Sequence, residues 1–318
     1  MMRLTVAICT WNRSQLLRRT LEQMCRVVVP PDVEWELILV DNNSTDDTRQ
    51  VVEEFVGRLP IRYVFEPKQG LSHARNRAVQ EAQGDYILWT DDDVLVDEGW
   101  MQAYVEGFRK YPEAAFFGGP IEAWFEGEPP DWLSQTLRLV EHAYAIRHLG
   151  DEEYALPRGE DGLPYGANYC LRGDWQKRFD YDTALGVKGS SRTLGEETVL
   201  LQQVVSVGGT GRWLPRARVR HWIPQSRQTL KYLRQYYFGG GRTSCLLERE
   251  LLLAPTGKIW FGVPRWTWRA LIENTLRYVY CRATKPPEVW VPALVKMSRT
   301  WGYWYECRRL WKERRKNG

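Results

Sequence analysis

The sequence lacks closely spaced cysteines and long apolar runs. Its six cysteines are scattered over 318 residues with no CxxC pair, which argues against a zinc knot and against the disulfide framework of a small secreted protein. No uncharged stretch reaches the length needed to span a bilayer, and the apolar run near the N-terminus is too short for a signal-peptide core. We therefore expect a protein of the reducing cytoplasm.

Internal repeats and low-complexity tracts are lacking as well. Hydrophobic residues make up 43% of the chain, which is enough for a large α/β domain with an appended segment. The net charge is only +4, but from Arg299 to the end seven lysines and arginines stand against two glutamates. Seven of the sixteen tryptophans lie beyond residue 259. No nucleic-acid partner is expected.

Short apolar runs alternate with helical patterns through the first half of the chain. The runs typical of strands are Leu4–Cys9, Trp35–Val40, Ile61–Phe65 and Tyr86–Trp89. Between them, apolar residues recur at helical spacing within 16–24, 51–56 and 74–82. Continuous apolar strands separated by helices predict an α/β fold with a mostly parallel sheet covered on both faces.

Three polar clusters follow these predicted strands, at Thr10–Arg13, Asp41–Asp46 and Asp91–Asp93. Because ligands of parallel sheets bind at the carboxyl ends of the strands, the clusters predict a binding site there. In extended geometry Asp91 and Asp93 leave the same face and can share one hard cation, while Asp92 points elsewhere. A solvated acidic turn is the commoner role of an acidic triplet taken alone.

Further motifs follow in order, and the whole set resembles the bacterial inverting family-two glycosyltransferases of the GT-A fold. After the three clusters come Gly70–Asn76, Gly84–Tyr86, Gly166–Asn168, Phe179–Gly186, Gly195–Thr198, Val219–His221 and Ser226–Thr229. The resemblance implies a Rossmann-like GT-A domain over 1–244, with a nucleotide-binding half to about residue 118 and an acceptor-binding half over 119–244. A helical, Trp/Arg-rich C-terminal extension would cover 245–318.

The resemblance also implies metal-dependent transfer of a sugar from a nucleoside diphosphate sugar, UDP-linked, to a glycan or lipid-linked acceptor. The donor nucleotide would be bound by Thr10, Trp11, Asn12, Arg13, Asp41, Asn43, Arg75, Asp91 and Asp92. The metal, Mn²⁺ or Mg²⁺, would be held by Asp93, Asp91 and His221, and the acceptor by Asn168, Trp222 and Arg227. A lone histidine is more often structural, and an isolated arginine usually lies at the surface.

Inverting transfer needs a base that takes the proton of the acceptor hydroxyl group. The resemblance implies that Glu197 is this base, at a position where the family usually has aspartate, and it leaves Glu196 as the alternative. The dipole of a helix beginning there would favour acidic residues in the first turn in any case.

The C-terminal segment has an apolar stripe at helical spacing, formed by Trp268, Leu271, Ile272, Thr275, Leu276, Val279 and Tyr280. Such stripes usually pack on the core of the protein. Tryptophan, tyrosine and arginine together also suit a bilayer interface. They therefore also predict a peripheral membrane contact through 260–318, at the inner face of the cytoplasmic membrane.

Two other functions have to be weighed. A nucleotidyltransferase that makes nucleotide sugars needs a glycine-rich basic loop after its first strand, and Cys9–Arg13 has no glycine. A non-catalytic glycan-binding module would use tryptophans to stack on sugars, and it would have no use for both acidic pairs, Asp91/Asp93 and Glu196/Glu197.

Overall fold

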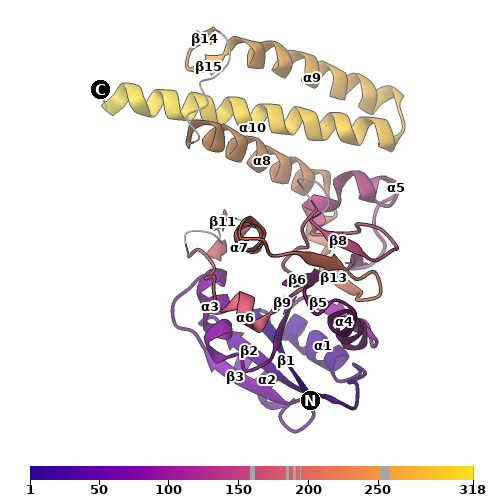
Figure 1. The fold of residues 1–318 in the computed structure, drawn as a ribbon. Helices are drawn as coiled ribbons and strands as arrows, with labels where there is room; N and C mark the ends of the chain where they lie inside the picture. The colour runs from indigo at the N-terminus through magenta and orange to yellow at the C-terminus, as the bar shows by residue number, and fades with distance from the viewer. Residues whose placement is uncertain (158–161, 184–185, 189–190, 194, 251–257, 318) are drawn as a thin grey trace. The chain divides into compact units, whose positions relative to one another are not determined.

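The computed structural model describes residues 1–157, 162–183, 186–188, 191–193, 195–250 and 258–317. These residues form two compact units (Figure 1). The first combines Met1–Trp124 with Ala145–Trp222, and the second combines Phe125–Tyr144 with Ile223–Gly318. The predicted boundary at residue 244 falls inside helix α8 (Leu230–Glu250). The division into a nucleotide-binding half and an acceptor-binding half at about residue 118 stays a prediction.

The first unit contains an eight-stranded sheet with the strand order β3-β2-β1-β4-β9-β6-β12-β8. The neighbours among the first four strands are parallel, and β9 is antiparallel to both β4 and β6. This confirms the predicted α/β class with a mostly parallel sheet. The strands are β1 (Met2–Thr10), β2 (Val33–Asp41), β3 (Ile61–Phe65), β4 (Tyr86–Asp91), β6 (Phe116–Gly118), β8 (Tyr154–Leu156), β9 (Tyr169–Arg172) and β12 (Gly211–Trp213).

Helices cover both faces of this sheet because alternate residues of the strands point to opposite sides. Leu4, Val6 and Ile8 of β1 join one core with residues of α1, α2 and α4. Ala7 joins the other core with residues of α3 and α7. The helices are α1 (Ser14–Met24), α2 (Thr48–Glu53), α3 (Leu71–Glu81), α4 (Trp100–Lys110), α6 (Gly173–Gln176) and α7 (Glu196–Ser206).

Smaller strands complete the unit. A three-stranded sheet has the order β5 (Val94–Val96), β13 (Val219–Ile223), β7 (Ile121–Phe125). The antiparallel pair β10 (Gly186–Lys188) and β11 (Ser191–Thr193) precedes α7. Pairing of β13 with β5 brings a late part of the chain next to the turn that follows β4.

The second unit is mainly helical, which confirms the predicted helical C-terminal segment. α8 and α9 (Arg265–Thr284) both pack on α10 (Pro287–Asn317), which lies between them (Figure 1). α5 (Asp131–Val140), the 3₁₀ turns Glu141–Tyr144 and Gln225–Arg227, and the strands β14 (Ile259–Trp260) and β15 (Val263–Pro264) complete it. Among the described helices, none has the length and apolar character that crossing a membrane requires.

Only part of the apolar stripe of α9 packs as its pattern favoured, namely Trp268, which lies against Cys245, Val263 and Cys307. Ile272, Leu276, Val279 and Tyr280 are exposed, and the helix instead buries Thr267, Asn274 and Cys281 on its opposite side. A periodic pattern identifies the two sides of a helix but not which residues meet a neighbour, and here small polar residues are the most deeply buried.

Backbone contact between α8 and α10 depends on two glycines. A Cβ atom added at Gly302 would lie 1.9 Å from the carbonyl oxygen of Phe238, and one added at Gly241 would lie 2.0 Å from that of Arg299. No real Cβ approaches a backbone oxygen so closely, so the two helices can cross at this distance only with glycine at both positions.

Substitution of Gly302 by alanine should therefore lower the free energy of unfolding by about 1–3 kcal/mol, the usual cost of an added methyl group in a packed interior. Gly241→Ala should act in the same direction. Gly239→Ala is the matched control, because no atom lies within 4 Å of its added Cβ and alanine favours a helix by about 1 kcal/mol over glycine. Urea unfolding followed by circular dichroism measures the three variants. Equal stability of Gly302→Ala and Gly239→Ala would contradict the close crossing.

Candidate active site

Strand register places the three polar clusters at one edge of the sheet. Thr10 at the end of β1 pairs with Asp41 at the end of β2, and Cys9 pairs with Asp91 at the end of β4. Because these strands are parallel, their carboxyl ends meet at the same edge, where α/β proteins bind ligands.

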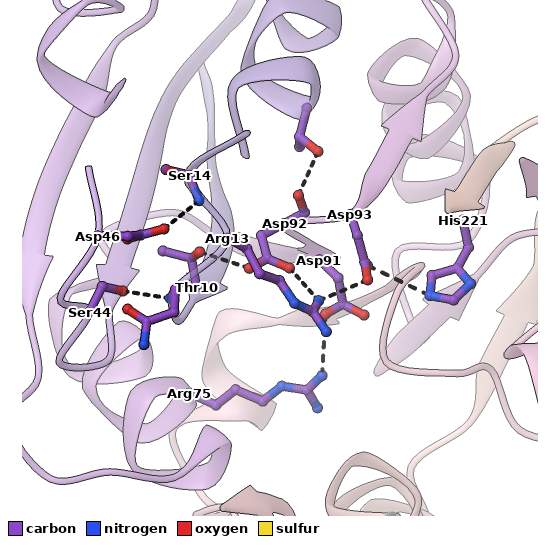
Figure 2. Close-up of polar contacts among 12 residues, drawn as sticks. Thr10, Arg13, Ser14, Ser44, Asp46, Arg75, Asp91, Asp92, Asp93 and His221 are labelled. Carbon is purple, nitrogen blue, oxygen red and sulfur yellow. Dashed lines mark hydrogen bonds and ion pairs between the residues drawn. The ribbon is translucent and has the colours of Figure 1, made fainter. Parts of the chain in front are cut away.

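The two loops that follow β1 and β2 are hydrogen-bonded to each other. The amide of Asn12 donates to Ser44 Oγ at 2.9 Å, and the Oδ1 atom of Asn12 accepts from the amide of Thr45 at 2.7 Å. The amide of Ser14 donates to Asp46 Oδ2 at 2.9 Å (Figure 2). Asn12 has a positive φ of 52°, a conformation that asparagine tolerates better than most residues. The side-chain carbonyl of Asn12 thus holds the second loop.

Asp41 is buried beneath these loops. Its Oδ1 atom accepts from the amide of Ser44 at 2.9 Å, and its Oδ2 atom accepts from the hydroxyl of Tyr63 at 2.7 Å. Burial and the nearby Asp41 carboxylate raise the pKa of Tyr63, so this hydroxyl stays protonated and donates. Trp11 and Asn43 are exposed on the loops beside it.

The aspartate triplet differs from the extended geometry expected of it. β4 ends at Asp91, and Asp92 and Asp93 form a turn before β5. Arg13 Nη1 donates to Asp92 Oδ1 and to Asp93 Oδ2, each at 2.8 Å (Figure 2). The expectation that Asp92 points away from Asp93 is therefore wrong, because a turn does not alternate sides as a strand does.

Further bonds fix Asp92 in place. Its Oδ2 atom accepts from the hydroxyl of Thr10 at 2.7 Å, and its carbonyl oxygen accepts from the hydroxyl of Thr20 at 3.0 Å. Burial raises the pKa of Asp92, with Arg13 opposing the shift and Asp93 adding to it. Asp92 therefore joins the loop after β1 to the turn after β4.

Strand pairing brings His221 to the same turn. His221 on β13 pairs with Val94, the first residue of β5. Its Nε2 atom lies 3.6 Å from Asp93 Oδ1, and the amide of Trp222 donates to the carbonyl oxygen of Asp93 at 2.9 Å. The aspartate and histidine predicted to share a metal are therefore neighbours.

Arg75 of α3 lies within a cluster of carboxylates rather than in solvent. Its Nη1 atom is 3.2 Å from Glu196 Oε1 and 3.9 Å from Glu197 Oε2, and its Nη2 atom is 3.8 Å from Asp91 Oδ1. The side chain is only 3% exposed. One guanidinium thus joins the end of β4 to the first turn of α7.

Three aromatic rings surround the same guanidinium. Its Cζ atom lies 5.8 Å from the ring centroid of Trp89, 5.9 Å from that of Tyr169 and 5.4 Å from that of Tyr181. Burial works against the charged form of Arg75, but Tyr169, Glu196 and Glu197 outweigh it, so its pKa lies above the ordinary value. Arg75 is therefore a cation at neutral pH.

Glu197 lies at the start of α7 beside this cation. Its Oε1 atom accepts from the amide of Gly166 at 3.3 Å. Burial raises the pKa of Glu197, the adjacent Glu196 raises it further, and Arg75 lowers it. A carboxylate with a raised pKa is a stronger base than an ordinary glutamate, which suits proton abstraction.

The three predicted acceptor residues lie in different settings. Asn168 is fully buried, with its Oδ1 atom accepting from Trp100 and Tyr104 and its Nδ2 atom donating to the carbonyl oxygens of Pro120 and Ala217. All its hydrogen-bonding capacity is used by the protein, so we do not carry it forward as an acceptor ligand.

Trp222 and Arg227 lie in separate units. The Trp222 ring packs edge-on against Trp124 at 4.4 Å between centroids, and the Arg19 guanidinium lies 5.4 Å from it. It is therefore an aromatic surface next to Asp93. Arg227 belongs to the 3₁₀ turn Gln225–Arg227 of the second unit.

Sequence reasoning missed residues that position others. Asn42 is buried, and its Oδ1 atom accepts from the amide of Gly70 at 2.7 Å, which fixes the start of the helix that carries Arg75. Asp46 holds the first amide of α1, and Tyr63 holds Asp41. Asn42 and Asp46 belong to the polar cluster after β2, but the sequence does not tell which members of that cluster turn inward.

The charges of the site suit a divalent cation. Five carboxylates, from Asp91, Asp92, Asp93, Glu196 and Glu197, face only two guanidiniums. Among the described residues, no three His, Cys, Asp or Glu side chains are already arranged around one point as metal ligands. Asp91 is 34% exposed at the edge of this group, and burial, opposed by Arg75 and reinforced by Asp93 and Asp92, raises its pKa to about 7. Oxygen donors with excess negative charge are what Mg²⁺ and Mn²⁺ prefer.

Comparison with known proteins supports the family that the motifs resemble. Residues 5–157 match the family described as glycosyl transferase family 2. The succinoglycan biosynthesis protein ExoM of Rhizobium meliloti (strain 1021) is 28% identical over 252 residues, which are 77% of this chain and 75% of that protein. These matches support a glycosyltransferase of family 2. The chain is a glycosyltransferase, and this sets aside the nucleotidyltransferase and the non-catalytic module.

Other relatives are matched over less of their length. Validoxylamine A glucosyltransferase of Streptomyces hygroscopicus subsp. limoneus is 30% identical over 150 residues, which are 46% of this chain and 33% of that protein. The chain thus spans about a third of that relative.

Solved structures confirm the GT-A fold of this glycosyltransferase. The mannosyltransferase PcManGT from Pyrobaculum calidifontis, in complex with GDP-Man and Mn²⁺, has a TM-score of 0.55 at 16% identity, covering 100% of this chain and 76% of that one. S. aureus TarS 1-349, in complex with UDP, has a TM-score of 0.54 at 13% identity, covering 100% of this chain and 92% of that one. At such identities the likeness concerns the fold alone.

The Arg75 cluster generates a stability prediction. Arg75→Met leaves the buried Glu196 without its cation, which should lower the free energy of unfolding by about 3–5 kcal/mol. Adding Glu196→Gln removes the uncompensated charge and should restore part of the loss. Urea unfolding of both single variants and the double variant measures the coupling between the two residues.

Arg49→Met is the control, because its pair with Glu53 is exposed and such pairs contribute about 0–1 kcal/mol. A double variant no more stable than Arg75→Met alone would contradict the pairing of Arg75 with Glu196.

Proposed function

We propose that this glycosyltransferase moves a sugar from a nucleoside diphosphate sugar, UDP-linked, to a glycan or lipid-linked acceptor by metal-dependent inverting displacement. The observation that carries the proposal is the buried cluster in which Arg75 lies between Asp91 at the end of β4 and the glutamate pair at the start of α7. The closeness of Asp91 and the glutamate pair to one cation supports the proposal that a donor-binding carboxylate and the base lie side by side.

The donor nucleotide binds at the carboxyl edge of the parallel strands. Asp41, which is buried beneath the hydrogen-bonded loops after β1 and β2, accepts a hydrogen bond from the base. Thr10, Trp11, Asn12 and Asn43 line the same edge of the sheet. Asp92 accepts hydrogen bonds from Thr10 and Arg13, and these bonds fix the turn after β4. This turn lies on the side of the site where the ribose and the diphosphate would bind. Two solved relatives of this fold were obtained with nucleotide ligands, GDP-Man in PcManGT and UDP in TarS, which supports a nucleotide site here.

A divalent metal fits the donor set of Asp91, Asp93 and His221. When bound, Mn²⁺ or Mg²⁺ would neutralise the charge that develops on the departing diphosphate. PcManGT was obtained with Mn²⁺, which supports this choice. Arg13 already bridges Asp92 and Asp93, so it holds both carboxylates near the position where the diphosphate would lie.

Glu197 performs the proton transfer. The acceptor hydroxyl oxygen forms the new bond to the anomeric carbon while the bond from that carbon to the diphosphate oxygen breaks, and Glu197 takes the hydroxyl proton. Arg75 positions Glu196 and Glu197, and the amide of Gly166 fixes one oxygen of Glu197. Because Arg75 is buried among carboxylates, it acts on the donor chiefly through Asp91.

The acceptor is a glycan or a lipid-linked sugar, and Trp222, next to Asp93, is its candidate ligand in the first unit. ExoM, a relative over most of the chain, is named for succinoglycan biosynthesis, which supports a role in polysaccharide biosynthesis. A lipid-linked acceptor would place the enzyme in the cytoplasm at the inner face of the membrane, as a peripheral protein.

Substitution of Glu197 by glutamine should separate binding from chemistry. Glutamine keeps the size and a hydrogen-bond acceptor but removes the base, so sugar transfer should fall by about 10² to 10⁴, the usual effect of losing a general base. Donor affinity, measured by calorimetry, should persist. The wild-type rate should rise with pH around a value above the ordinary pKa of glutamate, because burial raises the pKa of Glu197 and only the ionised form accepts a proton.

Glu196→Gln is the matched control, and it should reduce transfer less because Glu196 only pairs with Arg75. A near-normal rate in Glu197→Gln with a collapsed rate in Glu196→Gln would reverse the assignment. Full activity in both variants would remove the pair from the mechanism.

A further inference from the structure

Helix α9 buries small residues and leaves several large apolar residues exposed. The residues that it buries, Thr267, Asn274 and Cys281, are spaced by seven. On the opposite side the exposed residues are large and apolar, namely Ile272, Leu276, Val279 and Tyr280. A surface helix normally turns its apolar side to the core, so this arrangement calls for a second neighbour.

Polar contacts help to hold α9 on α10. Asn274 Nδ2 donates to Thr300 Oγ1 at 3.0 Å, and Trp301 Nε1 donates to Thr275 Oγ1 at 3.1 Å. Among the described residues of this unit, α9 packs mainly against α10 and β15. These bonds orient the helix, so the outward direction of its apolar side is built into the fold.

The hairpin that leads into α9 presents a second apolar group. Ile259, Trp260 and Phe261 are exposed at the turn between β14 and β15. The turn is held by Gly262, which has a φ of 80°, and by Arg308, whose Nη1 donates to the carbonyl oxygen of Phe261 at 3.1 Å. β14, β15 and α9 lie on the side of α10 opposite α8 (Figure 1).

The charges around these apolar residues are mostly positive. Between residues 258 and 288 there are six cations and two acids, and all eight are exposed: Lys258, Arg265, Arg269, Arg277, Arg282 and Lys285 against Glu273 and Glu288. Glu273 already pairs with Arg269. The Arg265 guanidinium lies 4.7 Å from the ring centroid of Trp260, so cation and indole occupy one surface.

The tryptophans of the C-terminal segment divide between two environments. Trp260 and Trp266 are about half exposed, whereas Trp290 is buried in the helical unit. The sequence predicted a membrane contact anywhere within 260–318. Among the described residues of this segment, it is the outer side of α9 and the hairpin before it that expose a group of apolar residues suited to such a contact. We refer to Ile259–Phe261 together with Ile272, Leu276, Val279 and Tyr280 as the α9 face.

We propose that the α9 face binds the surface of an anionic lipid bilayer. Its apolar side chains would enter the boundary between headgroups and acyl chains, tryptophan and tyrosine would lie at headgroup depth, and cations beside them, such as Arg265, would meet lipid phosphates. A second copy of the chain fits less well, because pairing two such faces brings like charges together. This inference rests on the proposed peripheral location but not on the chemistry of transfer.

Flotation of the full chain with vesicles tests the α9 face. Vesicles of phosphatidylcholine with phosphatidylglycerol should bind the protein, and pure phosphatidylcholine vesicles should bind it at least about tenfold less, since each cation contributes near an anionic surface. The double variant Leu276→Gln/Val279→Gln should lose about tenfold or more in binding to the anionic vesicles, because two inserted apolar side chains are removed.

Val56→Gln is the matched control, because Val56 is 66% exposed in the first unit and Leu276 is 65% exposed; it should bind vesicles like the wild type. Glu197→Gln should also bind normally, so loss of catalysis and loss of membrane binding remain distinguishable. Equal binding to both vesicle types, or unchanged binding by the α9 double variant, would overturn the proposal. Sedimentation without lipid adds one outcome: a wild-type dimer that the double variant dissociates would assign the α9 face to self-association instead.

Discussion

The ion-pair cluster around Arg75 is the interaction on which the rest of the site depends. Transfer of a guanidinium from water to the protein interior costs free energy, so a buried guanidinium is stable only beside groups of opposite charge. Its partners are Asp91, which ends a central strand, and Glu196 and Glu197, which begin a helix from a distant part of the chain. The cluster therefore fixes the position of Asp91 relative to Glu196 and Glu197, and Arg75 changes the electrostatic environment of all three carboxylates.

Around this cluster, the sheet and two strand pairings supply the geometry. Parallel register brings the ends of β1, β2 and β4 to one edge, and the antiparallel pairing of β13 with β5 adds His221 beside Asp93. The loops are held by bonds among themselves, such as Asn12 with Thr45. The hydrogen-bonded loops can then present a fixed surface to a ligand, and Trp11 and Asn43 are exposed at the edge of this surface.

The sequence predicted the first four strands of the fold well. Buried parallel strands are continuous apolar runs, so β1 to β4 were found within a few residues of their ends. β6, β8, β9 and β12 were missed because three or four residues are too few to establish a period. The side that α9 buries was also misjudged, since Thr267, Asn274 and Cys281 are buried and Asn274 donates a hydrogen bond to Thr300 of α10.

The structure brings together several residues that the sequence predicted for the site, but their geometry could not be predicted. The motifs indicated Asp91–Asp93, Arg75 and the glutamate pair. No sequence pattern reveals that Arg75 is buried among these carboxylates, or that the protein interior uses all the hydrogen-bonding groups of the Asn168 side chain. Such facts depend on contacts between distant segments. Asp92 and Asp93 form a turn because β4 ends at Asp91. Three consecutive aspartates in the sequence do not indicate where the strand ends.

The central claim is that the carboxyl edge of the sheet binds a nucleoside diphosphate together with a divalent metal. Thermal denaturation with UDP, GDP and the corresponding nucleotide sugars, each with Mn²⁺ or with EDTA, tests it directly, because a ligand that binds only the folded state raises Tm. The account predicts that UDP with Mn²⁺ raises Tm more than either alone, and that Asp93→Asn loses the part that requires Mn²⁺. A protein whose Tm responds to no nucleotide, or responds equally in EDTA, would contradict it.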